Sequence, residues 1–264
     1  MSLMTLGKGQ RVEQTSADGP ILRIENVSKV FGRGPEATVA LQDVSLEVND
    51  GEFITIVGAS GCGKSTLLNL IADLDQPTSG TLEVGRKTAF MFQEATLLPW
   101  LTARQNVEIA LKLAKVPKRD RGPRADELLE TVRLSGWGDK RPHELSGGMR
   151  QRVALARCLA QDAGIVLMDE PLGALDAMTR DHLHDEIETV AREQGLTVIF
   201  VTHNMREAIR LGDRVILMGS TPGRIVYEEE IPLPHPRVMD SPEVATRAAA
   251  LTARLKEQGH THVG

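Results

Sequence analysis

The sequence predicts an α/β fold with a mixed central sheet, an antiparallel β subdomain and an inserted helical subdomain. Three patterns support this prediction. Residues 21–30 and 39–48 alternate apolar and polar side chains, as half-buried antiparallel strands do. Apolar positions have helical spacing between Thr102 and Gln161. From Ile165 to Met218 strands and helices alternate, which indicates a parallel sheet with helices packed on both faces.

The individual elements follow from the same patterns and from their boundary residues. Thr102 with Gln105, and Asn204 with Glu207, have the spacing of helix capping boxes, and Gly195 ends a long helical pattern. The predicted strands are residues 21–30, 39–48, 53–57, 81–84, 88–92, 165–168, 198–202 and 215–218, with a last one after a turn within 221–231. The predicted helices are residues 66–72, 102–114, 123–134, 146–161, 177–194, a short one after Asn204, and 242–258.

Composition excludes several classes of protein. The 264 residues are 41% apolar and 25% charged, which suits one large soluble domain. The longest apolar runs fall far short of the roughly 18 residues that span a membrane. A net charge of −5 argues against a nucleic-acid partner, and we interpret the basic run 115–124 as a solvated loop. Two cysteines and a polar N-terminus without a secretion signal indicate a cytosolic protein.

A phosphate-binding loop is the strongest motif. Residues 58–66 contain the pattern GxxxxGK[ST] between a predicted buried strand and a predicted helix, the context that this motif requires. The glycines let backbone N–H groups point at phosphate oxygens, Lys64 adds a positive charge at the β- and γ-phosphates, and the Ser65 hydroxyl ligates Mg²⁺. We therefore expect ATP and Mg²⁺ to bind here. The residues of this loop are Gly58, Ala59, Ser60, Gly61, Cys62, Gly63, Lys64, Ser65 and Thr66.

Cys62 occupies a variable position of the loop, where a small filling side chain is the simplest interpretation. The neighbouring N–H groups and Lys64 are able to lower the pKa of its thiol. Under that second interpretation, thiol reagents would inactivate the enzyme and ATP would protect it.

Two adjacent carboxylates, Asp169 and Glu170, end the predicted strand 165–168. Neighbouring side chains at a strand end point to opposite sides. Asp169 is then available to the Mg²⁺ shell, and Glu170 to the attacking water as general base. By itself an acidic pair at a strand end is a common turn, but downstream of a phosphate loop it predicts a hydrolytic site.

A second anion-binding helix start is predicted at residues 145–152. Ser146 is suited to cap the helix, and Gly147 and Gly148 follow it. A capped helix with no ligand is the simple alternative. Because one nucleotide already has its phosphate loop, this helix start suggests contact with a different nucleotide.

Together these motifs resemble those of the ATP-binding-cassette (ABC) ATPases, and LSGGMRQR is similar to their signature sequence. The resemblance runs from about Ile21 to Arg237. It implies one ABC ATPase domain over 21–237 with a helical subdomain inserted at about 94–163, preceded by a flexible tail (1–20) and followed by a C-terminal helix and tail (238–264). It also implies a head-to-tail homodimer in which Ser146, Gly147 and Gly148 of one copy contact the γ-phosphate held by the other.

The resemblance assigns four further residues. Gln93 matches the glutamine that contacts Mg²⁺ and the attacking water, and Asp176 matches the aspartate that links the two cassettes. His203 matches the histidine that contacts the γ-phosphate, although outside this family a hydrogen-bonded structural histidine would be the simpler interpretation. Phe31 stands where the family has a tyrosine stacking on adenine, and a core position is its alternative.

The segment 92–106, with EEIPLPHPR near the end of the chain, is similar to the nitrate, sulfonate, taurine and bicarbonate branch of bacterial importers. This implies a peripheral protein on the cytoplasmic face of the membrane that powers uptake through a separate permease, served by an extracytoplasmic solute-binding protein. Leu97, Leu98 and Trp100 would form the permease docking patch, with core packing an equal alternative for Leu97. A separate-chain exporter or another membrane process remains the alternative function.

Overall fold

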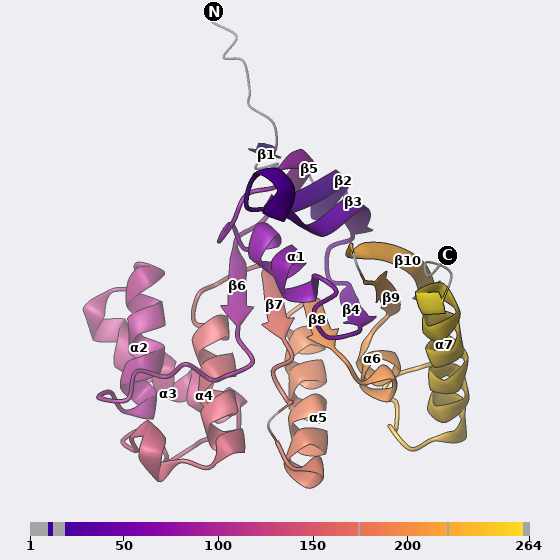
Figure 1. Ribbon diagram of the computed structural model, residues 1–264. Coiled ribbons are helices and arrows are strands. Elements are labelled where there is room, and N and C mark those ends of the chain that lie inside the picture. The colour runs from indigo at the N-terminus through magenta and orange to yellow at the C-terminus, as the bar shows by residue number, and fades with distance from the viewer. Residues whose placement is uncertain (1–9, 13–18, 174, 221, 261–264) are drawn as a thin grey trace, which may run out of the picture. The chain divides into compact units, whose positions relative to one another are not determined.

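The computed structural model describes residues 10–12, 19–173, 175–220 and 222–260 (Figure 1). The chain divides into two compact units. Unit 1 takes the residues up to Arg86 and those from Thr197 onward, and unit 2 is Lys87–Leu196. Within the described ranges no helix is long and apolar enough to cross a membrane.

Unit 1 contains a four-stranded sheet with the order β1-β5-β2-β3. The long strands pair in antiparallel fashion, as the alternating patterns predict. A strand that the sequence does not predict, β1, pairs in parallel with β5. An edge strand offers unpaired backbone groups to any extended segment nearby, so β1 can join without a strong pattern of its own. The bounds are β1 Gln10–Val12, β2 Leu22–Phe31, β3 Thr38–Val48 and β5 Ser79–Val84, with the 3-10 turn η1 Gly34–Glu36 between β2 and β3.

A second group of strands in unit 1 is built around β4 (Phe53–Gly58). It pairs in parallel with β8 (Thr197–Thr202) on one side and β9 (Arg214–Gly219) on the other, while β10 (Arg224–Glu230) is antiparallel to β9. Every residue of β4 and β8 is buried, which explains their unbroken apolar sequences. The predicted mixed sheet is therefore confirmed.

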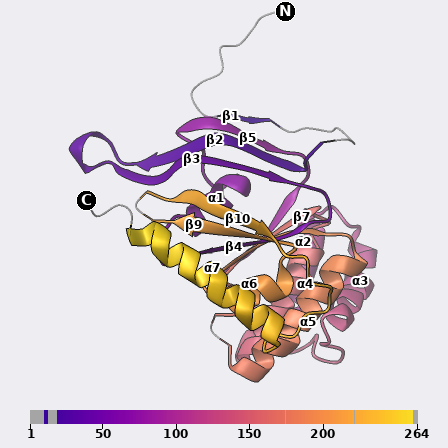
Figure 2. The same cartoon turned by 90° about the vertical axis from the view of Figure 1, so that its right-hand side faces the viewer.

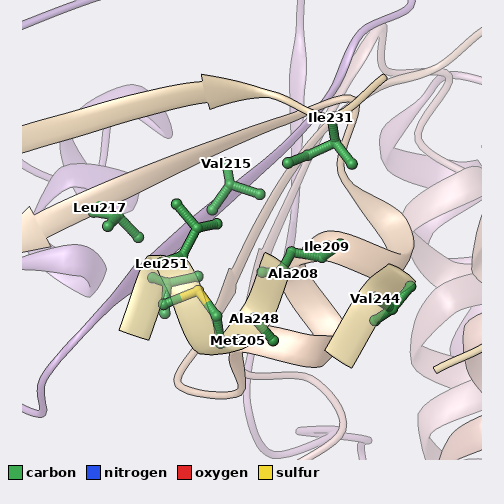
Figure 3. Close-up of a cluster of buried hydrophobic side chains, with 10 residues drawn as sticks. Met205, Ala208, Ile209, Val215, Leu217, Ile231, Val244, Ala248 and Leu251 are labelled. Atoms are coloured by element: carbon green, nitrogen blue, oxygen red, sulfur yellow. The ribbon is translucent and has the colours of Figure 1, made fainter. Parts of the chain in front are cut away.

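Three helices complete unit 1: α1 (Lys64–Ile71), α6 (Met205–Leu211) and α7 (Pro242–His260). Helix α7 lies against α6 and β9, and this packing can be followed in Figures 1 and 2. The cluster of apolar side chains that joins them is drawn in Figure 3.

Unit 2 pairs β6 (Thr88–Met91) in parallel with β7 (Ile165–Asp169). Four helices belong to it, and α2, α3 and α4 pack on one another. The capping box predicted for Thr102 and Gln105 is present at the start of α2. The helix bounds are α2 Ala103–Leu113, α3 Lys118–Thr131, α4 Gly147–Leu159 and α5 Ala177–Glu193, with the 3-10 turn η2 Pro142–Glu144 before α4.

The loop predicted for residues 115–124 is wrong over most of its length, because α3 begins at Lys118. Pro117 precedes the helix and Pro123 lies within it. Lys118, Arg119 and Arg124 remain exposed, while Ala125, Leu128 and Leu129 are buried. Burial of this later face stabilises a helix whose start has little apolar character.

Candidate active site

The phosphate loop joins β4 to α1. Strand β4 ends at Gly58, and α1 begins at Lys64 after Gly63, whose φ of 96° is a conformation that glycine adopts with little strain. The Lys64 ammonium donates hydrogen bonds to the carbonyl oxygens of Gly58 (2.9 Å) and Ala59 (3.0 Å). The lysine is only 5% exposed, so its charge lies inside the loop. The predicted succession of strand, loop and helix is confirmed.

Two glycines of the loop stand where no side chain fits. A Cβ atom on Gly58 would lie 2.6 Å from the Cys62 sulfur, and one on Gly63 would lie 2.7 Å from the Leu41 Cδ2 atom. Both distances are well below an ordinary van der Waals contact. The backbone therefore packs tightly underneath, and its N–H groups, together with those of the first turn of α1, suit the oxygens of a phosphate.

The remaining loop positions differ in exposure. Ser65, in the first turn of α1, is exposed, and Thr66 is half-buried. Ala59, Ser60 and Gly61 are exposed as well, and Gly61 has a φ of 77°. The Ser65 hydroxyl is thus accessible to a ligand.

Cys62 lies beneath the loop and is 1% exposed. Burial raises the pKa of its thiol above the ordinary value, and this effect exceeds the lowering by the Lys64 ammonium, 3.9 Å from the sulfur. The lowered pKa that we considered from the sequence is therefore wrong. A protonated, enclosed thiol fits the simpler interpretation of a small filling side chain.

His203 follows β8, the strand next to β4. Val57 is the register partner of Thr202 in this parallel pair. Gly58 and His203 come one residue later, and therefore leave the sheet at the same edge, where open α/β sheets bind ligands. The structure thus places the phosphate loop and the exposed His203 together within unit 1.

The residues around His203 form a fixed turn. The Thr202 hydroxyl donates to the carboxylate of Glu207 and accepts a hydrogen bond from the Asn204 N–H (3.0 Å). The Asn204 side chain accepts from the N–H groups of Arg206 and Glu207 at the start of α6. Asn204 is therefore the predicted cap, but Glu207 bonds to Thr202 rather than closing a capping box.

Phe31 ends β2 and is 45% exposed, so the alternative of a core position is wrong. The Lys29 ammonium lies 4.9 Å from the centre of its ring. One ring face thus carries a cation–π contact.

In unit 2, the side chains of Gln93 and Glu170 both lie near Gly173. A Cβ atom placed on Gly173 would be 3.7 Å from Gln93 Nε2 and 4.0 Å from Glu170 Oε2. Asp169 is the last residue of β7. Glu170 has a φ of 43°, outside the extended region, so the alternation of side chains that we expected from a strand ends at Asp169.

The starts of α4 and α5 form a second group in unit 2. Ser146 caps α4 by accepting from the Met149 N–H (3.2 Å), and Asp176 caps α5 by accepting from the Thr179 N–H (3.0 Å). Gly148 lies against Thr179, where a Cβ atom would be 2.4 Å from the threonine methyl carbon. The segment from Ser146 to Gly148 is thus brought beside the helix that begins after Asp176.

The cap of α5 carries a negative charge. The hydrogen bonds that the Asp176 carboxylate accepts, first of all from Thr179, lower the pKa of its carboxyl below the ordinary value. Asp176 is exposed and therefore stays ionised and accessible. Two helix N-termini, one of them with an acidic cap, lie side by side here.

Sequence reasoning missed Gln151. This residue of α4 is 4% exposed, and its side-chain amide donates to the carbonyl oxygen of Gln93 (2.8 Å). It lies within LSGGMRQR, but nothing in the residue spacing points to a partner nearly sixty positions earlier. The bond ties the helix that begins at the signature sequence to the backbone of Gln93.

The apolar residues after Gln93 lie at the surface to different degrees. Trp100 is 67% exposed, and Leu97 and Leu98 are half-buried. Asn106 holds this segment, since its side chain accepts from the Leu98 N–H (2.8 Å). Full core burial of Leu97 is thereby excluded.

Comparison with known proteins identifies the family. The family model described as ABC transporter matches residues 41–173. The aliphatic sulfonates import ATP-binding protein SsuB of Bacillus licheniformis is 45% identical over 233 residues, which cover 85% of this chain and 90% of that protein. The taurine import ATP-binding protein TauB of Roseobacter denitrificans is 45% identical over 220 residues, covering 80% and 82%.

A solved structure agrees with these relatives. The dimeric, post-hydrolysis state of the ATP-binding cassette MJ0796 bound to ADP and Pi is 36% identical, with a TM-score of 0.71, and the match covers 80% of this chain and 98% of that one. The chain therefore belongs to the ABC transporter family. It is an ATP-binding, ATP-hydrolysing cassette, and the predicted family and fold are confirmed.

Proposed function

We propose that this chain is the ATP-hydrolysing subunit of an importer for a small solute such as a sulfonate, taurine or nitrate. The observation that carries the proposal is the 45% identity to sulfonate and taurine import subunits over at least four-fifths of each chain. In this function the protein is peripheral to the cytoplasmic face of the membrane and acts through a separate permease.

The loop 58–66 would hold the triphosphate of ATP. Its tightly packed glycines and enclosed Lys64 ammonium fit phosphate oxygens. Mg²⁺ would take the Ser65 hydroxyl and the side-chain oxygens of Gln93 and Asp169, because hard oxygen donors are the ligands that it prefers. Bound there, Mg²⁺ would neutralise charge that develops on the phosphates. Phe31 would offer its open ring face to adenine.

Hydrolysis would use the carboxylate of Glu170 as general base. Glu170 takes a proton from water while the water oxygen bonds to the γ-phosphorus, and the bond from that phosphorus to the bridging oxygen of ADP breaks. Gln93 would orient the water, and His203 would donate to the γ-phosphate. The products are ADP and phosphate, and the proton later returns to solvent.

A second copy of the chain would complete the site. Ser146, Gly147 and Gly148 present a helix N-terminus, and Asp176 presents an ionised cap beside it. In a head-to-tail homodimer these groups would contact the nucleotide bound by the partner and link the two cassettes. The dimeric MJ0796 cassette supports an assembly of this kind. We further propose that residues 94–163 form the helical subdomain, inserted in a domain spanning 21–237.

Copurification tests the proposed function. Tagged chain is purified from detergent-solubilised membranes, and the accompanying proteins are identified by mass spectrometry. We expect a membrane permease, and we expect taurine, an alkanesulfonate or nitrate to raise the melting temperature of the solute-binding protein encoded with it. Capture of an exporter membrane subunit would overturn the importer function. A solute-binding protein that none of these anions stabilises would overturn the proposed substrate class.

A further inference from the structure

Two parts of the C-terminal region hold helix α6, which begins two residues after His203. The first is an apolar cluster (Figure 3). Val244, Ala248 and Leu251 of α7 are buried with Met205 and four other members contributed by α6 and β9. Ile231, which follows β10, belongs to the same cluster, as does Val57, the residue before the phosphate loop. The C-terminal region therefore packs on α6 and on the end of β4 that leads into the phosphate loop.

The second part is Arg237, the last residue of the EEIPLPHPR segment. It is 6% exposed, and its guanidinium donates to the carbonyl oxygens of Ile209 and Gly212 (2.6 Å) at the C-terminal end of α6. It also donates to the carbonyl oxygens of Ile231 (2.8 Å) and Leu233 (2.9 Å) in its own segment. One planar group thus satisfies carbonyl groups at a helix end that would otherwise lack intrahelical partners.

The bond network is reciprocal. Arg210 of α6 is 5% exposed and donates from Nε to the backbone carbonyl of Arg237 (3.1 Å). Helix α6 is therefore fixed at its C-terminal end by Arg237 and at its N-terminal end by the cap of Asn204. With only seven residues, such a helix has little stability of its own and depends on these contacts.

We propose that Arg237 is a positioning residue for His203. It acts through α6: by fixing the C-terminal end of this short helix, the guanidinium sets where the opposite end and the turn at His203 lie relative to the phosphate loop. This inference rests on the proposed function, in which His203 contacts the γ-phosphate. It assigns Arg237 to the geometry of ATP hydrolysis.

The test is a double-mutant cycle on ATP hydrolysis by the full-length chain. Arg237→Gln should lower kcat roughly tenfold while the KM for ATP changes less than about twofold, because a small displacement of a reacting group costs rate more than binding. In the His203→Ala background the same substitution should change the residual rate by less than about twofold, because the residue through which Arg237 acts is gone. Arg237→Lys, which retains charge but not the planar donor set, should fall between Gln and wild type.

Arg247→Gln is the matched control. It removes one arginine from α7, where Arg247 pairs with Glu229 of β10 (2.6 Å) rather than with α6. This variant should keep wild-type kcat. Melting temperatures are recorded for every variant, and if Arg237→Gln does not fold, the cycle is run with Arg237→Lys.

The outcomes separate the inference from the function beneath it. If His203→Ala leaves kcat unchanged, the proposed role of His203 is wrong. If His203→Ala lowers kcat but Arg237→Gln lowers it equally in both backgrounds, or not at all, Arg237 does not act through His203 and the inference is overturned.

Discussion

Gly148 and Thr179 pack so closely that a Cβ atom on the glycine would lie 2.4 Å from the threonine methyl carbon. This contact joins the first turn of α4, at the signature sequence, to the first turn of α5, beside Asp176. The glycine therefore has a steric reason to be there, independent of any nucleotide. We expect both helix starts to act as one unit in the proposed head-to-tail homodimer.

The first prediction follows from that contact. Gly148→Ala should lower the free energy of unfolding by about 1–3 kcal/mol, the usual cost of overpacking. Adding Thr179→Ser removes the methyl group that is in the way and should recover most of the loss, measured by urea denaturation. Thr179→Ser alone is the control. Equal stability of Gly148→Ala with and without Thr179→Ser would show that the methyl group is not the obstacle.

Cys62 provides the second prediction. Because its pKa is raised and its sulfur is enclosed, the thiolate is scarce at neutral pH, and a maleimide should label it slowly in the folded chain with or without ATP. The measurement uses the Cys158→Ser variant, so that any label reports on Cys62. In the wild-type chain Cys158 should also resist labelling, because burial raises the pKa of its thiol to about 12. Labelling is followed by intact mass, with urea-unfolded chain as the fast reference. Rapid labelling that ATP blocks would restore the reactive-thiol hypothesis.

Local signals predicted well what depends on neighbouring residues. The run 53–57 identified a buried strand, and Thr102 and Asn204 identified helix starts, because the caps bond to N–H groups two or three residues away. Pro123 was a misleading signal: it indicated that no helix begins before residue 123, whereas α3 begins at Lys118. Burial of the later face of α3 outweighs this local signal. The conformation of Glu170 was not predictable either, because tertiary packing rather than residue type imposes a positive φ there.

The same distinction applies to the candidate site. The phosphate loop is local in sequence and its course was predicted, whereas Gln151 reaches Gln93 only through the folded chain.

The third prediction concerns the hydrogen bond between Gln151 and the Gln93 carbonyl. Gln151→Met keeps the length but removes the donor, at a cost of about 0.5–1.5 kcal/mol, the net contribution of a typical hydrogen bond.

We expect Gln151→Met to reduce the stimulation of ATP hydrolysis by the permease more than the basal rate, because Gln93 leads into the proposed docking segment. The control is Gln161→Met, since the Gln161 side chain makes only a long bond (3.4 Å) to the Arg157 carbonyl. Stimulation is measured with the permease in proteoliposomes. Unchanged stimulation would remove Gln151 from the link between the signature helix and the permease.

Trp100 carries the fourth prediction. Because Trp100 is 67% exposed, Trp100→Ala should change the free energy of unfolding by less than about 0.5 kcal/mol. If it anchors the permease, the variant should lose copurification with the membrane subunit and keep wild-type ATP affinity. Trp137→Ala, at a tryptophan that is 41% exposed on the same unit, serves as control. Retained copurification would place the anchor elsewhere.

The last prediction concerns Glu170, whose carboxylate lies near Gly173, as does the side chain of Gln93. Glu170→Gln keeps the shape of the side chain and removes the group that accepts the proton of water. Hydrolysis should fall by roughly 10²-fold or more, the usual contribution of a positioned base, while ATP affinity persists. Because the trapped nucleotide is not consumed, the variant should accumulate a dimer in ATP that size-exclusion chromatography with light scattering detects. Glu193→Gln, at the exposed end of α5, should behave as wild type. Near-normal turnover by Glu170→Gln would assign the base to another residue, even if the dimer formed.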